Sequence, residues 1–259
     1  MFFRIIMPNY NNEQWIDKSI GSVLSQTFKD FKFVFVDDSS ADNSYEKAFE
    51  MLKPYENMLT THRLKKLWNG GARNVGLKYF NGTKYTLFLD SDDWFVDVNV
   101  LQDLHDFIVD NDYPDCIRLP YLCRIGDKEM PVILLDSNPS DLVRSAFVAC
   151  WTKCIKSELV RPFPENTLME DVVQHIKQCD KITTIEPFYR PVVVWNRNNR
   201  NSCSRAENQG LQRGKWQSSM YRYMADLLDL ELTHDYCIAE RDKRAKVCLG
   251  NIKADKYIQ

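Results

Sequence analysis

Three short apolar segments in the first hundred residues are predicted to be buried strands, and each of them ends in polar residues. The segments are residues 2–7, 31–36 and 87–89, which are rich in aromatic and branched aliphatic side chains. Between the first two, Ile16, Ile20 and Val23 recur at helical spacing, which predicts a helix over residues 14–26. A strand, a helix and a strand in this order form a right-handed parallel crossover, so the polar strand ends should meet at one edge of a sheet.

Carboxylates gather at two of these strand ends. Asp37 and Asp38 follow the second strand, and three of the four residues that follow the third are acids: Asp90, Asp92 and Asp93. Carboxylate oxygens are hard ligands that suit Mg²⁺ or Mn²⁺, and an ion held by only a few of them also takes substrate phosphates. Alternatively, the acids are turn and helix-capping residues without a ligand.

The rest of the chain predicts a mixed second half and a helical tail. We expect helices at residues 98–109, 141–149 and 170–179, strands at 116–122, 130–135 and 188–195, and a hairpin-like loop at 125–128. Residues 211 to about 253 have apolar side chains at helical spacing, which is typical of packing rather than chemistry. The predicted units are a domain of residues 1–205, with halves of about 1–110 and 111–205, and a helical extension of residues 206–259.

Five motifs in order resemble the family-2 glycosyltransferases of GT-A fold. They are Met7-Pro8-Asn9-Tyr10-Asn11-Asn12, Ser25-Gln26-Thr27-Phe28, Val36-Asp37-Asp38-Ser39-Ser40, Asn69-Gly70-Gly71-Ala72-Arg73-Asn74-Val75-Gly76 and Asp90-Ser91-Asp92-Asp93. Met169-Glu170-Asp171 and Cys150-Trp151-Thr152-Lys153 are similar to later motifs of that family, and beyond about Arg205 the resemblance ends. The resemblance implies an α/β fold of GT-A type, a Rossmann-like mixed sheet, followed by the helical C-terminal extension.

The same resemblance implies roles for individual residues. The donor-binding residues would be Pro8, Tyr10, Asn11, Asp38, Arg73, Asn74, Asp90 and Ser91. Asp92 and Asp93 would hold Mn²⁺ or Mg²⁺, and candidates for contacts with the diphosphate or the acceptor are Trp151, Arg197 and Arg200. For Arg73, the alternative is a structural ion pair with an aspartate of the metal motif.

Asp171 is the predicted general base. It begins a helix beside Glu170 and among apolar residues, where partial desolvation would raise its pKa. Favourable interaction of both acids with the positive end of the helix dipole is the alternative. A single base without a second nucleophilic carboxylate implies one displacement at the anomeric carbon, and hence inversion.

Composition narrows the class of protein. The chain has 259 residues, 44% of them hydrophobic, which is enough for one α/β domain. We expect no signal peptide and no membrane span, and therefore a cytoplasmic protein that is at most peripheral to a membrane. Eight cysteines without a Cys-x-x-Cys pair are expected to be reduced core residues, a redox pair of Cys150 and Cys154 being the alternative.

Charge leaves the acceptor open. The formal net charge is -2, which argues against nucleic-acid binding over the whole surface, but residues 190–215 carry six basic side chains against one acid. The prediction is an inverting transferase that moves a sugar from a UDP-sugar to a saccharide or lipid-linked saccharide. Two alternatives remain: a phage-type DNA glycosyltransferase that acts on a hydroxylated base such as hydroxymethylcytosine, and a nucleotide-sugar binding protein without catalysis.

Overall fold

The protein is built around a mixed sheet of seven strands. The computed structural model describes residues 1–62, 67–145, 149–165, 167, 169–199 and 213–254, with only the backbone for residues 62, 213–220 and 250–254. The strand order is β10-β6-β9-β4-β1-β2-β3, and all neighbours are parallel except β9, which is antiparallel to both β4 and β6. Their bounds are β1 Phe3–Asn9, β2 Phe31–Asp37, β3 Met58–His62, β4 Tyr85–Phe88, β6 Cys116–Arg118, β9 Lys153–Lys156 and β10 Ile185–Pro187.

A second sheet of four strands packs against the first, and its strands β5 and β7 follow β4 and β6 along the chain. Its order is β5-β11-β7-β8, and its strands are β5 Trp94–Phe95, β7 Tyr121–Ile125, β8 Lys128–Val132 and β11 Val193–Asn196. The expectation of one strand at residues 116–122 was therefore wrong. Leu119 and Pro120 separate β6 from β7, and since proline lacks an N–H for the ladder, the chain changes sheets there.

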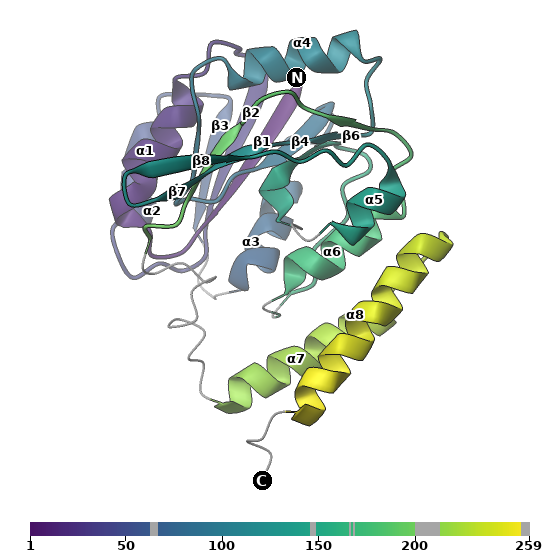
Figure 1. Cartoon of the computed structure of the whole chain (residues 1–259). Helices are drawn as coiled ribbons and strands as arrows, with labels where there is room; N and C mark the ends of the chain where they lie inside the picture. The colour runs from purple at the N-terminus through teal and green to yellow at the C-terminus, as the bar shows by residue number, and fades with distance from the viewer. Residues whose placement is uncertain (63–66, 146–148, 166, 168, 200–212, 255–259) are drawn as a thin grey trace.

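Helices cover the sheets and form the C-terminal part (Figure 1). They are α1 Glu13–Leu24, α2 Ser44–Leu52, α3 Trp68–Leu77, α4 Val100–Asp110, α5 Pro139–Arg144, α6 Glu170–Cys179, α7 Arg213–Leu228 and α8 Asp235–Ala254, with a short 3-10 turn at Cys150–Thr152. The predicted helix at residues 170–179 and the helical tail are confirmed. The predicted unit boundary at residue 205 lies outside the described residues.

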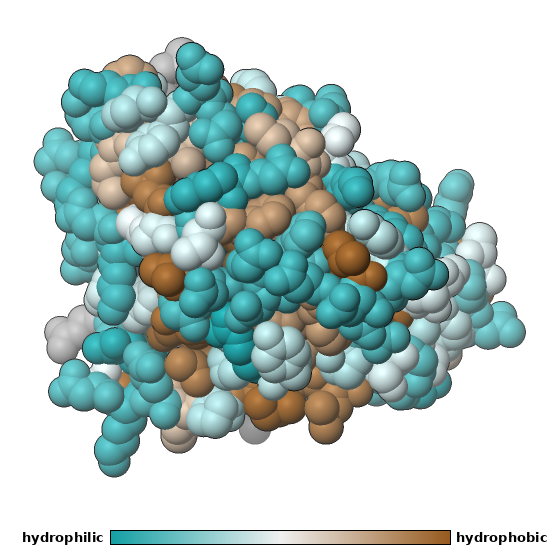
Figure 2. Space-filling model, turned by 90° about the horizontal axis from the view of Figure 1, so that it is seen from above, coloured by the Kyte–Doolittle hydropathy of each residue, from teal (hydrophilic) through white to brown (hydrophobic). Residues whose placement is uncertain are grey.

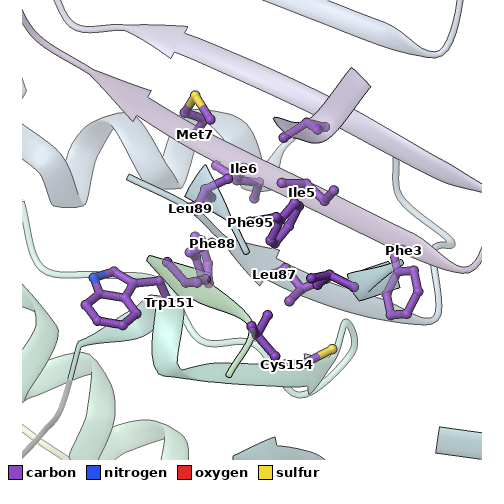
Figure 3. Packing of buried hydrophobic residues seen from close by; sticks show 14 of the residues in the cluster. Phe3, Ile5, Ile6, Met7, Leu87, Phe88, Leu89, Phe95, Trp151 and Cys154 are labelled. Carbon is purple, nitrogen blue, oxygen red and sulfur yellow. The ribbon is translucent and has the colours of Figure 1, made fainter. Parts of the chain in front are cut away.

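The main hydrophobic core lies between β1, β4 and the elements around them. Figure 3 shows Ile5, Ile6 and Met7 of β1 beside Leu87 and Phe88 of β4. β1 and β4 are paired in parallel register, so these side chains are brought together by the sheet itself. The strands are apolar on both faces because helices or the second sheet cover each face.

A second core joins the C-terminal helices to the sheet. Tyr223 and Leu227 of α7 and Cys237 of α8 belong to the same buried cluster as Val172 and Ile176 of α6. Figure 1 shows α7 and α8 side by side next to α6. Seven cysteines are free thiols in buried positions, as expected, and Cys203 lies outside the described residues.

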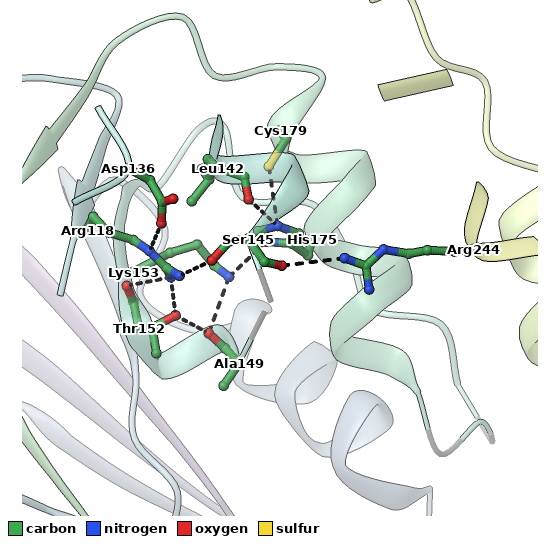
Figure 4. A network of polar contacts seen from close by, with 10 residues as sticks. All are labelled: Arg118, Asp136, Leu142, Ser145, Ala149, Thr152, Lys153, His175, Cys179 and Arg244. Atoms are coloured by element: carbon green, nitrogen blue, oxygen red, sulfur yellow. Dashed lines mark hydrogen bonds and ion pairs between the residues drawn. The ribbon is translucent and has the colours of Figure 1, made fainter. Parts of the chain in front are cut away.

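A buried polar network ties β6, β9 and α6 together beneath this second core (Figure 4). The guanidinium of Arg118 donates to Asp136 Oδ2 at 2.8 Å and to Ser145 Oγ at 2.9 Å. Lys153 Nζ contacts His175 Nδ1 at 3.1 Å, while His175 Nε2 lies 2.9 Å from the Leu142 carbonyl. That carbonyl accepts only, so Nε2 carries the proton and Nδ1 accepts from Lys153.

One face of the molecule carries many hydrophilic side chains (Figure 2). On the face in Figure 2, hydrophilic side chains surround smaller groups of hydrophobic ones. Among the residues that the structure describes, none of the helices is both long enough and apolar enough to cross a membrane.

Candidate functional site

The carboxyl ends of β1 and β2 form one wall of the candidate site. Asn9 and Asp37 are register partners, and Asn9 Nδ2 donates to Asp37 Oδ1 at 2.8 Å. Asp37 Oδ2 also accepts from the Ser40 N–H at 3.0 Å, so this carboxylate organises the turn after β2. Of the two aspartates, Asp37 thus has the capping role that was the alternative for the pair.

The predicted donor-binding residues of this wall lie close to one another. Asp38 is 2% exposed, and its Oδ1 accepts from the Leu67 N–H at 2.8 Å, which connects the end of β2 to the start of α3. Asn11 has a φ of 54° and accepts from the Ala41 N–H at 2.7 Å. Pro8 is buried in β1, whereas Tyr10 is 38% exposed and presents its ring at the end of that strand.

The four residues of the acidic motif after β4 differ in their exposure and in their hydrogen-bond partners. Asp90 keeps a side-chain exposure of 29%, and Asp92 is partly exposed. Ser91 and Asp93 are each 1% exposed, and Asp93 Oδ1 accepts from the Asn196 N–H of β11 at 2.8 Å. Asp93 is thus a buried link between the acidic motif and the second sheet, and its support of a metal ion stays a prediction.

Two asparagines hold this motif in position: Asn12, the last residue of the first motif, and Asn199, which no sequence motif contains. Asn12 Nδ2 donates to Ser91 Oγ at 2.9 Å. Asn199 Nδ2 donates to Asp92 Oδ2 at 2.8 Å and to Asn12 Oδ1 at 2.9 Å. No short motif marks Asn199, because its partners are separated from it by 107 and 187 positions along the chain.

Arg73 joins the two acidic parts of the site. Its guanidinium is 1% exposed and lies 2.8 Å from Asp90 Oδ1, 2.9 Å from Glu170 Oε1 and 3.2 Å from Asp171 Oδ1. Arg73 therefore makes the ion pair with the acidic motif that was its alternative role, and it also reaches the predicted base. A planar guanidinium can bridge carboxylates in this way because it presents donors in fixed directions.

Glycine allows this close approach of α3 and α6. A Cβ on Gly70 would lie 2.3 Å from the Pro164 carbonyl oxygen and 3.2 Å from Glu170 Cβ. Asn74, four residues on, donates to the Phe163 carbonyl at 2.9 Å and accepts from the Phe163 N–H at 2.9 Å. Both functional atoms of the Asn74 amide thus hold the loop before α6, and a contact of Asn74 with the donor stays a prediction.

Burial and crowding of charge raise the pKa values of the acids. Burial is the largest cause for Glu170 and Asp171, and repulsion from neighbouring carboxylates adds to it, while Arg73 opposes the shift. Burial, followed by repulsion from Asp90, raises the pKa of Asp92 to about 6. The nearby Cys150 thiol also acts to lower the pKa of Asp171 and so favours its charged form.

The remaining predicted contacts are distributed differently. Trp151 is 4% exposed and packs edge to face on Tyr121 at 5.0 Å between ring centroids, so it belongs to the core. A contact of Trp151 with the diphosphate or the acceptor stays a prediction. Arg197 is exposed, with its guanidinium carbon 5.0 Å from the centroid of the Trp195 ring. Arg200 lies outside the described residues.

The family follows from comparison with known proteins. Residues 4–141 match the family model described as glycosyl transferase family 2. The chain belongs to this family. The match spans β1 to the start of α5 and therefore includes Asp38, Arg73, Asp90 and Asp92.

Two curated relatives and one solved structure are similar to the chain. The poly(ribitol-phosphate) beta-glucosyltransferase of Bacillus spizizenii is 33% identical over 198 residues, which are 73% of this chain and 30% of that protein. The UDP-Glc:alpha-D-GlcNAc-diphosphoundecaprenol beta-1,3-glucosyltransferase WfgD of Escherichia coli is 42% identical over 92 residues, 36% of this chain and 35% of that protein. The chain thus spans about a third of the length of these relatives.

The solved structure confirms the predicted GT-A fold. TarS 1-349 of S. aureus, crystallised in complex with UDP-GlcNAc, superposes with a TM-score of 0.74 at 22% sequence identity. The superposition covers 96% of this chain and 72% of that one. The fold of this chain is therefore similar to that of TarS 1-349 over nearly its whole length.

Proposed function

We propose that this protein is an inverting glycosyltransferase that moves a sugar from a UDP-sugar to a hydroxyl of a saccharide or lipid-linked saccharide. The observation that carries the proposal is the bridge made by Arg73 between Asp90, at a strand end facing the donor side, and Asp171, the candidate base. One buried cation thereby fixes the distance between donor-binding and proton-accepting groups. Such positioning is a large part of what accelerates a group transfer.

In the proposed reaction, Asp171 accepts the proton of the acceptor hydroxyl. The hydroxyl oxygen forms a bond to the anomeric carbon while the bond from that carbon to the nucleoside diphosphate breaks, so one displacement inverts the centre. Asp171 has a side-chain exposure of 28%, which leaves it accessible to a hydroxyl. Its raised pKa makes it a stronger base than an ordinary aspartate.

The acidic pair Asp90 and Asp92 fits a divalent cation. Burial and repulsion from Asp90 raise the pKa of Asp92, and a divalent cation beside Asp92 would offset both effects. Within the described residues, no group of three or more His, Cys, Asp or Glu side chains is arranged to hold an ion alone. Asp92, with Asp90 beside it, would therefore share Mn²⁺ or Mg²⁺ with the donor's phosphates, and the ion would stabilise the departing diphosphate.

The choice of donor and acceptor rests on relatives. The E. coli protein is named for a UDP-Glc donor and a lipid-diphosphate acceptor, and the Bacillus protein for a poly(ribitol-phosphate) acceptor. Both acceptors present hydroxyls on a phosphate-containing carrier. A nucleic-acid acceptor gains no support from the described part of residues 190–215, where Arg190 pairs with Asp97 at 2.8 Å and also with Asp103.

The test compares Asp171→Asn with Glu170→Gln in binding and turnover. Asp171→Asn should leave UDP affinity within a few-fold and lower kcat by ~10²–10⁴, the range for removal of a general base. Glu170→Gln should have the smaller effect on kcat. Equal turnover by Asp171→Asn and the wild type would contradict the assignment of the base, and donor hydrolysis that no added acceptor suppresses would contradict the transferase.

A further inference from the structure

A second pocket lies at the end of the main sheet opposite to the candidate site, which is at the carboxyl ends of β1 and β4. Its volume is about 680 Å³, and it is lined by residues at the start of β1 and β4 and at the end of β9, among them Arg4, Lys84, Lys156 and Ser157. β1 begins beside the N mark in Figure 1. Arg4 and Asn9 are five residues apart on this strand, so the pocket lies about 17 Å from the candidate site along β1.

The pocket contains a buried cation whose partners are all neutral. Arg4 is 4% exposed, and its guanidinium donates to Thr86 Oγ1 at 3.0 and 3.2 Å and to the carbonyls of Leu77 and Tyr79. Among the described residues, no carboxylate forms an ion pair with Arg4. Buried charges in proteins are normally paired, because removal from water costs several kcal/mol that neutral partners only partly return. Arg4 therefore favours an anion from outside the chain.

Hydroxyl groups extend this donor set toward the pocket. Because Thr86 Oγ1 accepts twice from Arg4, its own hydrogen is directed to Ser157 Oγ at 2.8 Å. The Ser157 hydrogen then points to Thr83 Oγ1, 3.2 Å away, or to an acceptor inside the pocket. Ser157 lines the pocket, so its hydroxyl can donate a hydrogen bond to a ligand while it accepts one from Thr86.

The rim carries two further cations. Lys84 Nζ lies 5.0 Å from the centroid of the Tyr113 ring, and within the described residues it has no carboxylate partner either. Lys156 pairs with Asp115 at 2.8 Å. Glu158 is the acid that lines the pocket, and it is exposed, so the positive charge prevails.

We propose that this pocket is a phosphate-binding site, separate from the donor site. The chemistry fits the oxygens of a phosphate group, since lysine supplies a point charge, arginine supplies charge at short range and a hydroxyl supplies a hydrogen bond. The group can come from a phosphorylated small molecule or from a phosphodiester of a polymeric acceptor. In the first case the ligand would stabilise the folded chain by binding to it. The second case rests on the proposed function, and the pocket would then hold the polymer at a distance from the reacting hydroxyl.

Calorimetric titration of the full chain with inorganic phosphate, in the presence of saturating UDP, tests the proposal. Binding should persist with UDP bound, because the two sites lie at opposite ends of the sheet. Lys84→Gln should weaken it about tenfold, the effect of one lost charged hydrogen bond. The matched control Lys128→Gln removes an equal charge from an exposed strand outside the pocket and should leave the affinity unchanged.

A second variant reaches the buried part of the site. Ser157→Ala keeps every charge, and its phosphate affinity should fall by a few-fold while its Tm without ligand changes little. Glycerol 3-phosphate and glycerophosphoglycerol then separate the two sources: tighter binding of the monoester supports a small molecule, and tighter binding of the diester supports a polymer. Loss of binding on addition of UDP, equal affinity of wild type and Lys84→Gln, or no binding at tens of millimolar phosphate would overturn the proposal.

Discussion

At the scale of single residues, Arg73 is central to the candidate site, because it forms ion pairs with three carboxylates. Asp90, Glu170 and Asp171 all lie within 3.2 Å of its guanidinium nitrogens, and Glu170 has a side-chain exposure of only 9%. One positive charge cannot neutralise three negative ones. Burial and repulsion between the carboxylates therefore still raise the pKa values of Glu170 and Asp171, although Arg73 opposes the shift. Removal of the cation would leave Glu170 buried without a charged partner, next to two partly exposed acids.

Arg73→Gln should therefore destabilise the protein by about 3–5 kcal/mol, the usual cost of removing one partner from a buried pair. Arg73→Lys keeps the charge but not the planar set of donors, so more stability should survive while kcat falls by about 10²-fold through misplacement of Asp171. Urea unfolding and kcat, measured on both variants, check the two effects separately. Arg144→Lys, on an exposed pair with Asp141 at 3.8 Å, is the control and should change neither.

The acids and the arginine of the site were predictable from the sequence, but their partners were not. Asp90, Asp92 and Asp171 stand in short local patterns that follow an apolar strand or begin a helix. Asp93 stands in the same pattern as Asp92, and only the tertiary approach of β11 buries it. Asn199 contacts the motif from 107 positions away along the chain, so no local sequence pattern marks it.

At the scale of elements, the approach of α3 to α6 depends on Gly70. Gly70→Ala would place a Cβ 2.3 Å from the Pro164 carbonyl oxygen, and backbone cannot move aside as a side chain can. We expect a loss of about 1–3 kcal/mol of stability and a larger fractional loss of kcat than of UDP affinity, because α6 carries the candidate base.

Gly21→Ala is the matched control for this prediction. Gly21 also lies inside a helix, α1, but a Cβ there meets nothing within 4 Å. Alanine is the better helix former, so this variant should gain ~0.5–1 kcal/mol and keep full activity. Chemical unfolding of both variants measures the two changes in stability. If Gly70→Ala and Gly21→Ala changed the free energy of unfolding in the same direction, the packing argument would be contradicted.

Asp180 links the end of α6 to the start of α8. It accepts from the Thr233 N–H at 2.8 Å and from the His234 N–H at 2.9 Å, and these bonds and Lys181 lower its pKa to about 2 against the cost of burial. Asp180→Ala should cost on the order of 2 kcal/mol. Asp127→Ala, at a fully exposed side chain, should cost within about 0.5 kcal/mol.

The sign of the pH dependence of this link follows from the direction of the shift. Because the pKa is lower in the folded state, the contribution of Asp180 is complete above the unfolded value of 3.8 and is lost as the pH falls through about 2. The difference in unfolding free energy between the wild type and Asp180→Asn should thus shrink between pH 4 and pH 2. A difference that grows as the pH falls would contradict this role of the carboxylate.

The helices and strands were predictable where they depend on a local pattern of apolar residues. The sheet to which each strand belongs was not predictable in this way. Residues 170–179 form a helix with the predicted bounds, and the parallel pairing of β1 and β2 follows from their crossover helix. The segment around Pro120 is continuous in its apolar pattern, but its two halves pair with different partners, β6 with β9 and β7 with β11. Pairing of strands distant in sequence is a tertiary property that periodicity does not contain.

At the scale of the whole molecule, the helical extension is part of the structure rather than an appendage. Leu227 of α7 is completely buried in the cluster that contains Ile155 of β9 and Ile176 of α6. β9 in turn pairs with β4, whose neighbour β1 lies at the centre of the main core. The two cores thus share the main sheet, so loss of one should weaken the other.

This continuity predicts that the chain unfolds as one unit when α7 is disturbed. Leu227→Ala should cost about 2–5 kcal/mol, the usual range for a buried leucine, and should shift the unfolding midpoints by tryptophan fluorescence and by far-ultraviolet circular dichroism together. All tryptophans except Trp216 lie outside α7 and α8, so fluorescence reports mainly on the rest of the fold. Leu228→Ala, one position along but 56% exposed, should leave both midpoints in place. If Leu227→Ala shifted the circular dichroism signal alone, α7 and α8 would be an independent unit, and the second core would contribute nothing to the stability of the site.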